Sequence, residues 1–206
     1  MRIERLENSK RKQERVLVYL EDGSILRITG AELLQFGLYQ GLDLPPETLA
    51  ALEAAARRSD TKRRGANMAA GRMLSKKELT SRLTRKGASP EDAADTADWL
   101  EELGAVDDAA YAGAIARHYG AMGCGAGRVR QELHRRGVPK ELWDEALAQL
   151  PPPEEAIRKF LRTKLRGRPL TPEDSRRMAA ALQRRGFSWQ DIRPALNEPG
   201  QEIDEA

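Results

Sequence analysis

The feature that most constrains the fold is a helical pattern that occurs three times, with a period of about fifty residues. In each copy two apolar residues lie four positions apart, and a glycine follows after another four positions. Such a pair lies on one face of a helix, and glycine often ends a helix because it adopts the left-handed conformation without a Cβ clash. The sequence therefore predicts three related helices, built on Leu79, Leu83 and Gly87, on Val129, Leu133 and Gly137, and on Met178, Leu182 and Gly186.

Each of these helices has a predicted helix on either side. The residue after each glycine is apolar, and a new helix start follows, as at Ser89-Pro90. Helical stretches also precede the three patterns, at about 60–73, 107–119 and 154–166. A unit of three short helices buries its apolar stripe poorly alone, so neighbouring units are expected to stack. Only 5% of the residues are aromatic, which favours several small cores over one thick core.

The N-terminal part has a different pattern. Residues 1–15 are polar and are expected to be loose, and the β-rich runs 16–20 and 25–28 follow, separated by Asp22-Gly23. An Asp-Gly pair between such runs predicts a β-hairpin. Thr29 and Glu32 have the spacing of a capping box that opens a short helix. A helix is then predicted over 47–58, and the sequence leaves open whether 59–65 breaks or continues it.

We therefore predict a mainly α protein. It would be an elongated array of three tandem three-helix repeats, of a winged-helix or helical-repeat type, with a small N-terminal module of a β-hairpin plus a helix. The predicted division of the chain is an N-terminal module at 1–58, repeats at 59–104, 105–151 and 152–197, and a disordered acidic tail at 198–206.

Charge follows the same units. Residues 61–86 contain nine Lys/Arg and one acid, whereas residues 90–110 contain eight acids and no Lys/Arg. Residues 111–140 contain six Lys/Arg and one acid, and residues 141–155 contain five acids and no Lys/Arg. The first two helices of a repeat are thus basic and the third is acidic. Stacked repeats would have a basic face and an acidic face.

Composition favours a cytoplasmic protein. The single cysteine, Cys124, excludes an intramolecular disulfide and fits a reducing compartment. No apolar run approaches the ~20 residues of a membrane span, and the first residues lack the apolar region of a secretory signal. The net charge of +3 is too small by itself to establish nucleic-acid binding, so the distribution of the charge matters.

Three motifs occur in order on this frame: Arg72-x2-Ser75-x2-Glu78-Leu79-x3-Leu83-x2-Lys86-Gly87, then Ala105-Val106-Asp107-Asp108-x2-Tyr111-Ala112-x4-Arg117, and then Gly125-x2-Arg128-x3-Glu132-Leu133-x2-Arg136-Gly137-Val138. Together they resemble the RecX family of RecA regulators. Each motif is weak alone, but three in order on a triplicated helical frame are specific, and the resemblance covers about residues 60–196. Some members of the family also have an N-terminal extension that contains a hairpin. Ala69 and the loose stretch 120–127 depart from the pattern.

The resemblance implies a function without catalysis. Such proteins bind RecA filaments on single-stranded DNA, lie along the filament groove, and reduce recombinase activity or promote disassembly. This chain is accordingly expected to be a monomer that modulates RecA in recombination and DNA repair. Its partners would be the RecA filament and single-stranded DNA, with double-stranded DNA a further candidate. No cofactor, metal or membrane is expected.

Basic residues in the first two repeats are the candidate contacts with RecA or DNA. One alternative is that they only cover solvated helix faces, and cations near a helix C-terminus are also favoured by the helix dipole. Few aromatic residues flank them, so binding by charge and shape is expected instead of base stacking. The candidates are Arg72, Lys76, Arg82, Arg85, Lys86, Arg117, Arg128, Arg130, Arg135 and Arg136.

Four other features have a structural and a functional interpretation. Asp107-Asp108 suggests either a helix N-cap or a metal pair, and the cap is favoured because no third ligand is near. The stretch Gly120–Gly127 is interpreted as a flexible connection and less readily as a phosphate loop, because it follows a helix. His118 and His134 have no zinc spacing. The tryptophans of the third helices are expected to pack in cores, or one of them to anchor a partner; they are Trp99, Trp143 and Trp189.

Two rival functions remain open. The chain could be a sequence-independent DNA-binding protein that acts without RecA, or a protein-binding scaffold that uses its acidic helices. An enzyme is the least favoured class, because the sequence has no positive sign of Ser-His-Asp or Cys-His catalysis.

Overall fold

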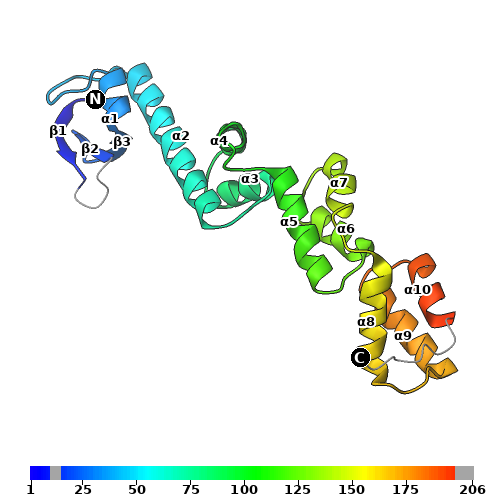
Figure 1. The fold of residues 1–206 in the computed structure, drawn as a ribbon. Helices are drawn as coiled ribbons and strands as arrows, with labels where there is room; N and C mark the ends of the chain where they lie inside the picture. The colour runs from blue at the N-terminus through cyan, green and yellow to red at the C-terminus, as the bar shows by residue number, and fades with distance from the viewer. Residues whose placement is uncertain (10–14, 198–206) are drawn as a thin grey trace. The chain divides into compact units, whose positions relative to one another are not determined.

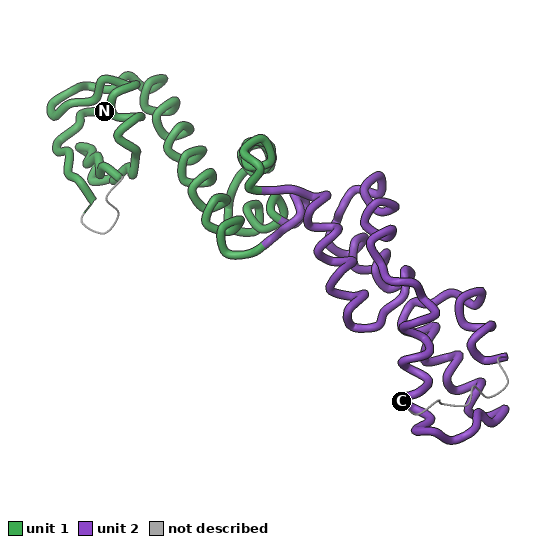
Figure 2. Tube along the Cα trace, viewed as in Figure 1, with its two compact units in different colours: residues 1–72, 79–105 green, residues 73–78, 106–206 purple. Residues whose placement is uncertain are grey.

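The computed structural model describes residues 1–9 and 15–197, and the predicted acidic tail at 198–206 lies outside them. The described residues are mostly helical, with a small antiparallel sheet at the N-terminal end (Figure 1). The chain forms two compact units. Unit 1 comprises residues 1–72 and 79–105, and unit 2 comprises residues 73–78 and 106–206 (Figure 2). The predicted mainly α class is confirmed.

The sheet has three strands where the sequence predicted two. Strands β2 (Arg15–Leu20) and β3 (Ile25–Thr29) form the expected hairpin, and Gly23 has a φ of 82° in the turn. The expectation that residues 1–15 are loose is wrong for β1 (Ile3–Asn8), which pairs antiparallel with β2. Ile3 is fully buried. Strand β1 forms although it is mostly polar, because its backbone satisfies the free edge of β2.

Two helices follow the sheet. Helix α1 (Gly30–Gln35) begins with the predicted capping box, in which the N–H of Glu32 donates to Thr29 at 3.2 Å and the N–H of Thr29 donates to Glu32 at 2.7 Å. Helix α2 (Pro46–Gly71) runs without a break through 59–65, which answers the open question. The predicted boundary at 58/59 thus falls inside one helix, and the five-part division of the chain remains a prediction.

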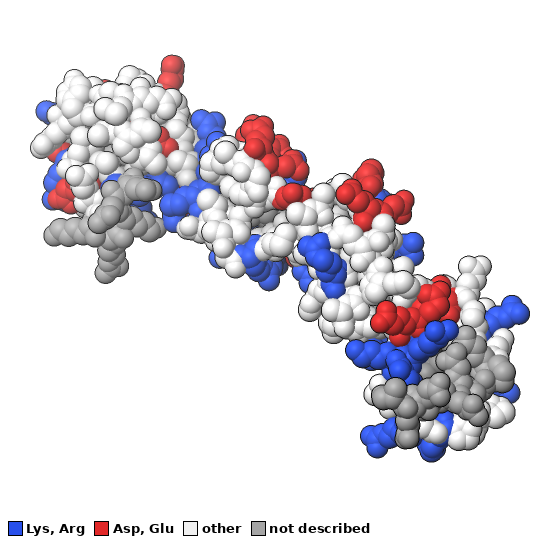
Figure 3. Space-filling view, in the orientation of Figure 1, with Lys and Arg blue, Asp and Glu red and all other residues white. Residues whose placement is uncertain are grey.

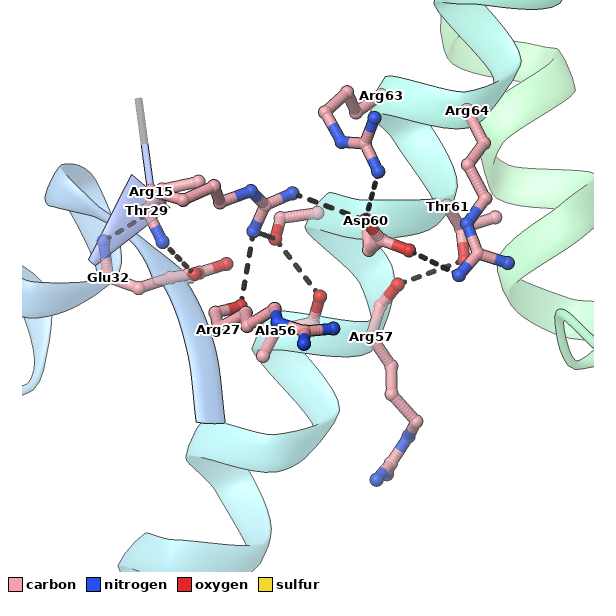
Figure 4. Close-up of polar contacts among 11 residues, drawn as sticks. Arg15, Arg27, Thr29, Glu32, Ala56, Arg57, Asp60, Thr61, Arg63 and Arg64 are labelled. Carbon is pink, nitrogen blue, oxygen red and sulfur yellow. Dashed lines mark hydrogen bonds and ion pairs between the residues drawn. The ribbon is translucent and has the colours of Figure 1, made fainter. Parts of the chain in front are cut away.

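A buried arginine joins the sheet to α2 (Figure 4). Arg15 on β2 is only 6% exposed and donates to Ser59 at 2.9 Å. It also lies 3.7 Å from Asp60, which binds Arg63 at 2.5 Å and Arg64 at 2.6 Å. Burial opposes ionisation of Asp60, but the hydrogen bond from Arg63 and the three guanidiniums outweigh it and lower the pKa of Asp60. Two cations of the basic segment 61–86 are therefore already paired.

The three predicted helical repeats are present. The predicted glycine ends are confirmed, since Gly87, Gly137 and Gly186 have φ values of 90°, 69° and 89°. The third helix of the second repeat is shorter than the others and begins with a 3₁₀ turn. The helices after α2 are α3 (Lys76–Arg85), α4 (Pro90–Glu102), α5 (Asp108–Ala121), α6 (Ala126–Arg135), η1 (Lys140–Leu142), α7 (Trp143–Leu147), α8 (Pro153–Leu165), α9 (Pro172–Arg184) and α10 (Trp189–Asn197).

The predicted apolar pairs form small separate cores. Leu79, Leu83, Val129 and Leu133 are fully buried, and Leu182 is too. In unit 2, α5, α6 and α7 enclose one cluster, and α8, α9 and α10 enclose another. Several small cores are what a chain rich in Ala and Leu and poor in aromatics was expected to build.

Neighbouring repeats meet in the same way twice within unit 2. Ser75, just before α3, donates its hydroxyl to the carbonyl of Arg136. Fifty residues later, the N–H of Gly125 donates to the carbonyl of Arg185 at 2.9 Å. In both junctions the start of the second helix of one repeat thus contacts the end of the second helix of the next. Repetition of this contact shows that the sequence repeat is also a packing repeat.

Glycine is required at the second of these junctions. A Cβ atom on Gly125 would lie 2.5 Å from the carbonyl oxygen of Gly186, and one on Gly186 would lie 2.1 Å from the backbone nitrogen of Arg128. The stretch Gly120–Gly127 thus allows two backbones to approach closely. Flexibility of this stretch remains a prediction.

Candidate nucleic-acid interface

The two residues directly before each of the three repeat glycines are basic, and we call these pairs the basic doublets. They occupy equivalent positions at the ends of α3, α6 and α9. Arg85 and Lys86 are exposed, and so are Arg184 and Arg185. In the second doublet Arg135 is exposed but Arg136 is half-buried. The helix dipole favours cations near a helix C-terminus. The place of each doublet at the end of its helix therefore accounts for its basic residues. The surroundings of the three doublets differ.

The second doublet is neutralised by a buried carboxylate. Glu132 is only 4% exposed. Arg135 donates to its Oε2 from Nε at 3.0 Å and from Nη2 at 2.6 Å. Arg128 lies 3.2 Å from Oε1, and Arg136 lies 3.5 Å from Oε2. Burial raises the pKa of Glu132, but the hydrogen bond and charge of Arg135, together with Arg128, outweigh it and hold the pKa below its usual range.

Arg136 belongs to a wider polar network in unit 2. Its Nη1 donates to the hydroxyl of Tyr111 on α5, and that hydroxyl donates to Glu78 at 3.0 Å. Tyr111 is 6% exposed, and burial raises the pKa of its phenol. Glu78 lies in the first turn of α3. The network therefore joins α3, α5 and α6 across the first repeat junction.

The position of Glu132 differs in the other two repeats. The repeat offset of 50 or 49 residues places Arg82 there in the first repeat and Ala181 in the third. The third doublet thus has no carboxylate one turn earlier on its own helix. Within residues 15–197, no ion pair of Arg184 or Arg185 is found. The same basic doublet is therefore paired with a carboxylate in the second repeat and has no such partner among the described residues in the third.

The remaining candidates lie on different elements of the two units. Arg72 is exposed and follows the end of α2. Lys76 is half-buried, and its backbone N–H donates to Asp108 at 2.9 Å. Arg82 is half-buried, Arg117 donates to Gln149 at 2.7 Å, and Arg130 is exposed on α6. Arg128, Arg135 and Arg136 are the candidates that the structure brings together, around Glu132.

Sequence reasoning missed Glu132 as the organiser of this group. The signal was available, because Arg128, Arg135 and Arg136 lie four before, three after and four after it. The cations of α8 and of the third doublet were also left out of the candidates. Acidic side chains do gather over α4 in unit 1 and over α7 in unit 2 (Figure 3). The acidic character predicted for these third helices thus appears at the surface of each unit.

The other candidate sites have structural roles where the structure tests them. Asp107 caps α5 by accepting from the N–H of Ala110 at 2.8 Å, which confirms the N-cap. Asp108 accepts from the start of α3, as described above. Among the described residues, no group of three or more His, Cys, Asp and Glu side chains has the arrangement of a metal site. No described helix is both long and apolar enough to span a membrane.

The tryptophans divide into two kinds. Trp143 is half-buried in the second-repeat core and donates its ring N–H to Val138 at 3.1 Å. Trp99 is also half-buried, with the ammonium of Lys62 5.0 Å from its ring centre. Trp189 is 52% exposed. The expectation of core packing thus holds in part for two of them, and the exposed ring of Trp189 leaves the partner-anchor alternative open.

Comparison with known proteins agrees with the repeat architecture. Residues 107–147 match the family model of the RecX second three-helix domain, and residues 153–196 match the RecX third three-helix domain. Regulatory protein RecX of Chlorobaculum tepidum is 33% identical over 132 residues, which cover 62% of this chain and 80% of that protein. The chain belongs to the RecX family. The resemblance noted from its motifs is thereby confirmed.

The RecX assignment extends to the N-terminal part of the chain. Regulatory protein RecX of Bacillus subtilis strain 168 is 26% identical over 212 residues, which cover 98% of this chain and 79% of that protein. A crystal structure of regulatory protein RecX matches with a TM-score of 0.74 at 24% identity and covers 93% of this chain and 97% of that one. This likeness supports the fold. The relatives carry the name of regulatory proteins, which suggests a regulator instead of an enzyme.

Proposed function

We propose that this RecX family member regulates the RecA recombinase by binding the RecA–single-stranded DNA filament and lowering its ATP turnover, strand exchange and growth. Membership of the family is the observation that carries the proposal. The exposed cations on α3, α6 and α9 support it, because a filament that holds DNA has a regular array of phosphates. Such cations bind phosphates by releasing counterions, without reading the base sequence.

The proposed contacts are electrostatic. The first doublet is exposed, and Arg82 stands where the second repeat has its carboxylate. We therefore infer that Arg82, Arg85 and Lys86 contribute more binding free energy than Arg135 and Arg136, whose charges Glu132 already offsets. In this proposal Arg128, Arg135 and Arg136 mainly hold α6 and the first repeat junction in place.

The direct test is RecA ATP turnover on single-stranded DNA, titrated with the protein. We expect turnover to fall as the protein is added. The triple variant Arg82→Glu, Arg85→Glu, Lys86→Glu is expected to need a higher concentration for the same effect while its thermal melt stays unchanged. A matched control, Arg57→Glu, Arg58→Glu, Lys140→Glu, changes the charge equally at exposed positions outside the candidate set. Equal potency of the two triple variants would contradict the assignment of these contacts.

A second candidate function is sequence-independent DNA binding without RecA. The exposed cations favour it equally, because they would bind the phosphates of bare DNA as well. Co-sedimentation with RecA filaments and with bare single strands separates the two functions. A regulator of RecA prefers the filament, whereas an independent DNA-binding protein shows no such preference.

A further inference from the structure

The second repeat junction has a pocket that the proposed function does not yet use. It has a volume of about 400 Å³ and lies where the end of α5 meets α8 and the end of α9. Its wall includes the segment Gly120–Gly123, Lys159, Phe160, Lys164 and Arg185. Volumes of about 300–1,000 Å³ are typical of sites that hold small organic ligands. Apart from Glu155, every charged residue in the lining is a cation.

Arg185 is held at this pocket by weak contacts. Its Nη1 lies 3.4 Å from the carbonyl oxygen of Met122 and 3.3 Å from that of Gly123. The guanidinium carbon lies 4.9 Å from the ring centre of Phe160. Within the described residues no carboxylate pairs with Arg185. The N–H donors on Nε and Nη2 thus remain available to an anion, and the aromatic ring limits the movement of the guanidinium.

The equivalent side chain at the first junction has no such freedom. Arg136 is surrounded by Tyr111 and Glu132, and Glu78 completes the network. At the second junction Ala181 replaces the carboxylate, and two exposed lysines of α8, Lys159 and Lys164, line the pocket instead. One junction is therefore closed by internal ion pairs, and the other has an excess of positive charge at a cavity.

We propose that this pocket binds the phosphodiester backbone of single-stranded DNA. Two ammonium groups and a planar guanidinium are suited to phosphate oxygens. The ring of Phe160 provides an apolar wall against a sugar or base. A single strand enters a concave site because its backbone bends, whereas the phosphates of a duplex lie on a stiff convex surface.

DNA binding by this pocket would add a contact in the third repeat to the proposed function. The proposal rests on the proposed function only for its biological role. The test is therefore made with bare DNA. The full-length protein is titrated into fluorescently labelled oligothymidylate, and anisotropy is followed at several salt concentrations. The pocket variant is Lys159→Glu, Lys164→Glu. The control is Arg162→Glu, Arg176→Glu, which makes the same change of charge at exposed positions of α8 and α9 outside the pocket lining.

We expect the pocket variant to bind on the order of twentyfold more weakly at 0.1 M salt, with the slope of log affinity against log salt reduced by about 1.4, because two phosphate contacts to a single strand are lost. The control should change affinity less than about threefold. Equal losses in the two variants would overturn the proposal. The milder variant Lys159→Gln, Lys164→Gln repeats the test should the reversed charges impair folding, and a circular dichroism melt checks this.

A competition experiment separates DNA from free nucleotide. Unlabelled oligothymidylate should displace the label, whereas ATP at the same phosphate concentration should not. Displacement by ATP and not by oligothymidylate would identify a free nucleotide as the ligand and overturn the proposal. RecA ATP turnover then separates this proposal from the proposed function. A pocket variant that binds bare DNA normally and still inhibits RecA refutes the pocket but leaves the regulator intact.

Discussion

The doublets at the ends of α6 and α9 have the same residues and the same relation to a following glycine, yet their surroundings differ. Arg135 and Arg136 share the buried Glu132, whereas Arg184 and Arg185 follow Ala181. One position on the inner side of a helix thus determines whether a basic doublet stabilises the protein or remains available to an anion. A motif repeated in sequence does not imply a function repeated at every copy.

The largest expected effect concerns the glycines that follow the doublets. Gly186→Ala should lower the free energy of unfolding by about 3–5 kcal/mol, because a left-handed alanine costs about 1–2 kcal/mol and the new Cβ would overlap the backbone of Arg128. Gly87→Ala also places an alanine at a positive φ, but the new Cβ has open space around it. This variant should lower the free energy of unfolding by about 1–2 kcal/mol. Urea unfolding of both variants measures the difference.

Gly137→Ala is expected to fall between these two, because its new Cβ meets the side chain of Lys77, part of which can move. Equal losses at all three positions would show that the second junction is not closely packed in solution.

The next largest effect concerns the doublet Arg135 and Arg136, which Glu132 neutralises. Glu132→Gln should lower the free energy of unfolding at pH 7 by about 2 kcal/mol, between values typical of surface and of buried ion pairs. The folded-state pKa of Glu132 lies below its unfolded value. Its stabilisation is therefore complete above the unfolded pKa of about 4.3 and is lost as the pH falls through the folded pKa.

Unfolding of wild type and Glu132→Gln at pH 7 and at successively lower pH measures this linkage. The two stabilities should converge in acid. A difference that stays constant down to the lowest pH would mean that the charge of Glu132 is not what matters.

A smaller effect is expected from Tyr111→Phe. The hydroxyl accepts from Arg136 and donates to Glu78, so its removal should cost about 1–2 kcal/mol. Tyr19→Phe is the matched control, because the Tyr19 hydroxyl makes one exposed hydrogen bond to Glu7 and should matter little. Thermal melts of the two variants provide the measurement, and a loss no greater than that of Tyr19→Phe would argue against the network.

The smallest expected effect comes from a variant that adds a carboxylate to the third repeat, at the position equivalent to Glu132. Ala181→Glu should pair with Arg184 or Arg185 and weaken binding of labelled oligothymidylate about fivefold at 0.1 M salt, as for one lost phosphate contact. Stability should change by less than about 1 kcal/mol, because Ala181 is only half-buried and both arginines are exposed. Gln190→Glu adds the same charge at an exposed position on α10. Identical affinities of these two variants would show that net charge alone, and not the position of the carboxylate, sets DNA binding.

Local features of the fold were predictable because they depend on neighbouring residues. The capping box at Thr29, the hairpin turn at Gly23 and the helix end at Gly137 each follow from a few adjacent side chains and backbone angles. The apolar pairs were predictable for the same reason, since their spacing determines the helix face. Strand β1 was not, because its pairing depends on the edge of β2 and not on its own polar sequence.

The period, the helix ends and the basic doublets can be read from the amino-acid pattern alone, because all of them depend on contacts along one helix. Which doublet is neutralised and which borders a cavity depends instead on how the helices pack. Burial of Glu132 depends on the packing of α6 against its neighbours, and the close approach at Gly186 depends on how two repeats meet. Interactions between groups distant in the chain are specified by packing, which a local pattern does not encode.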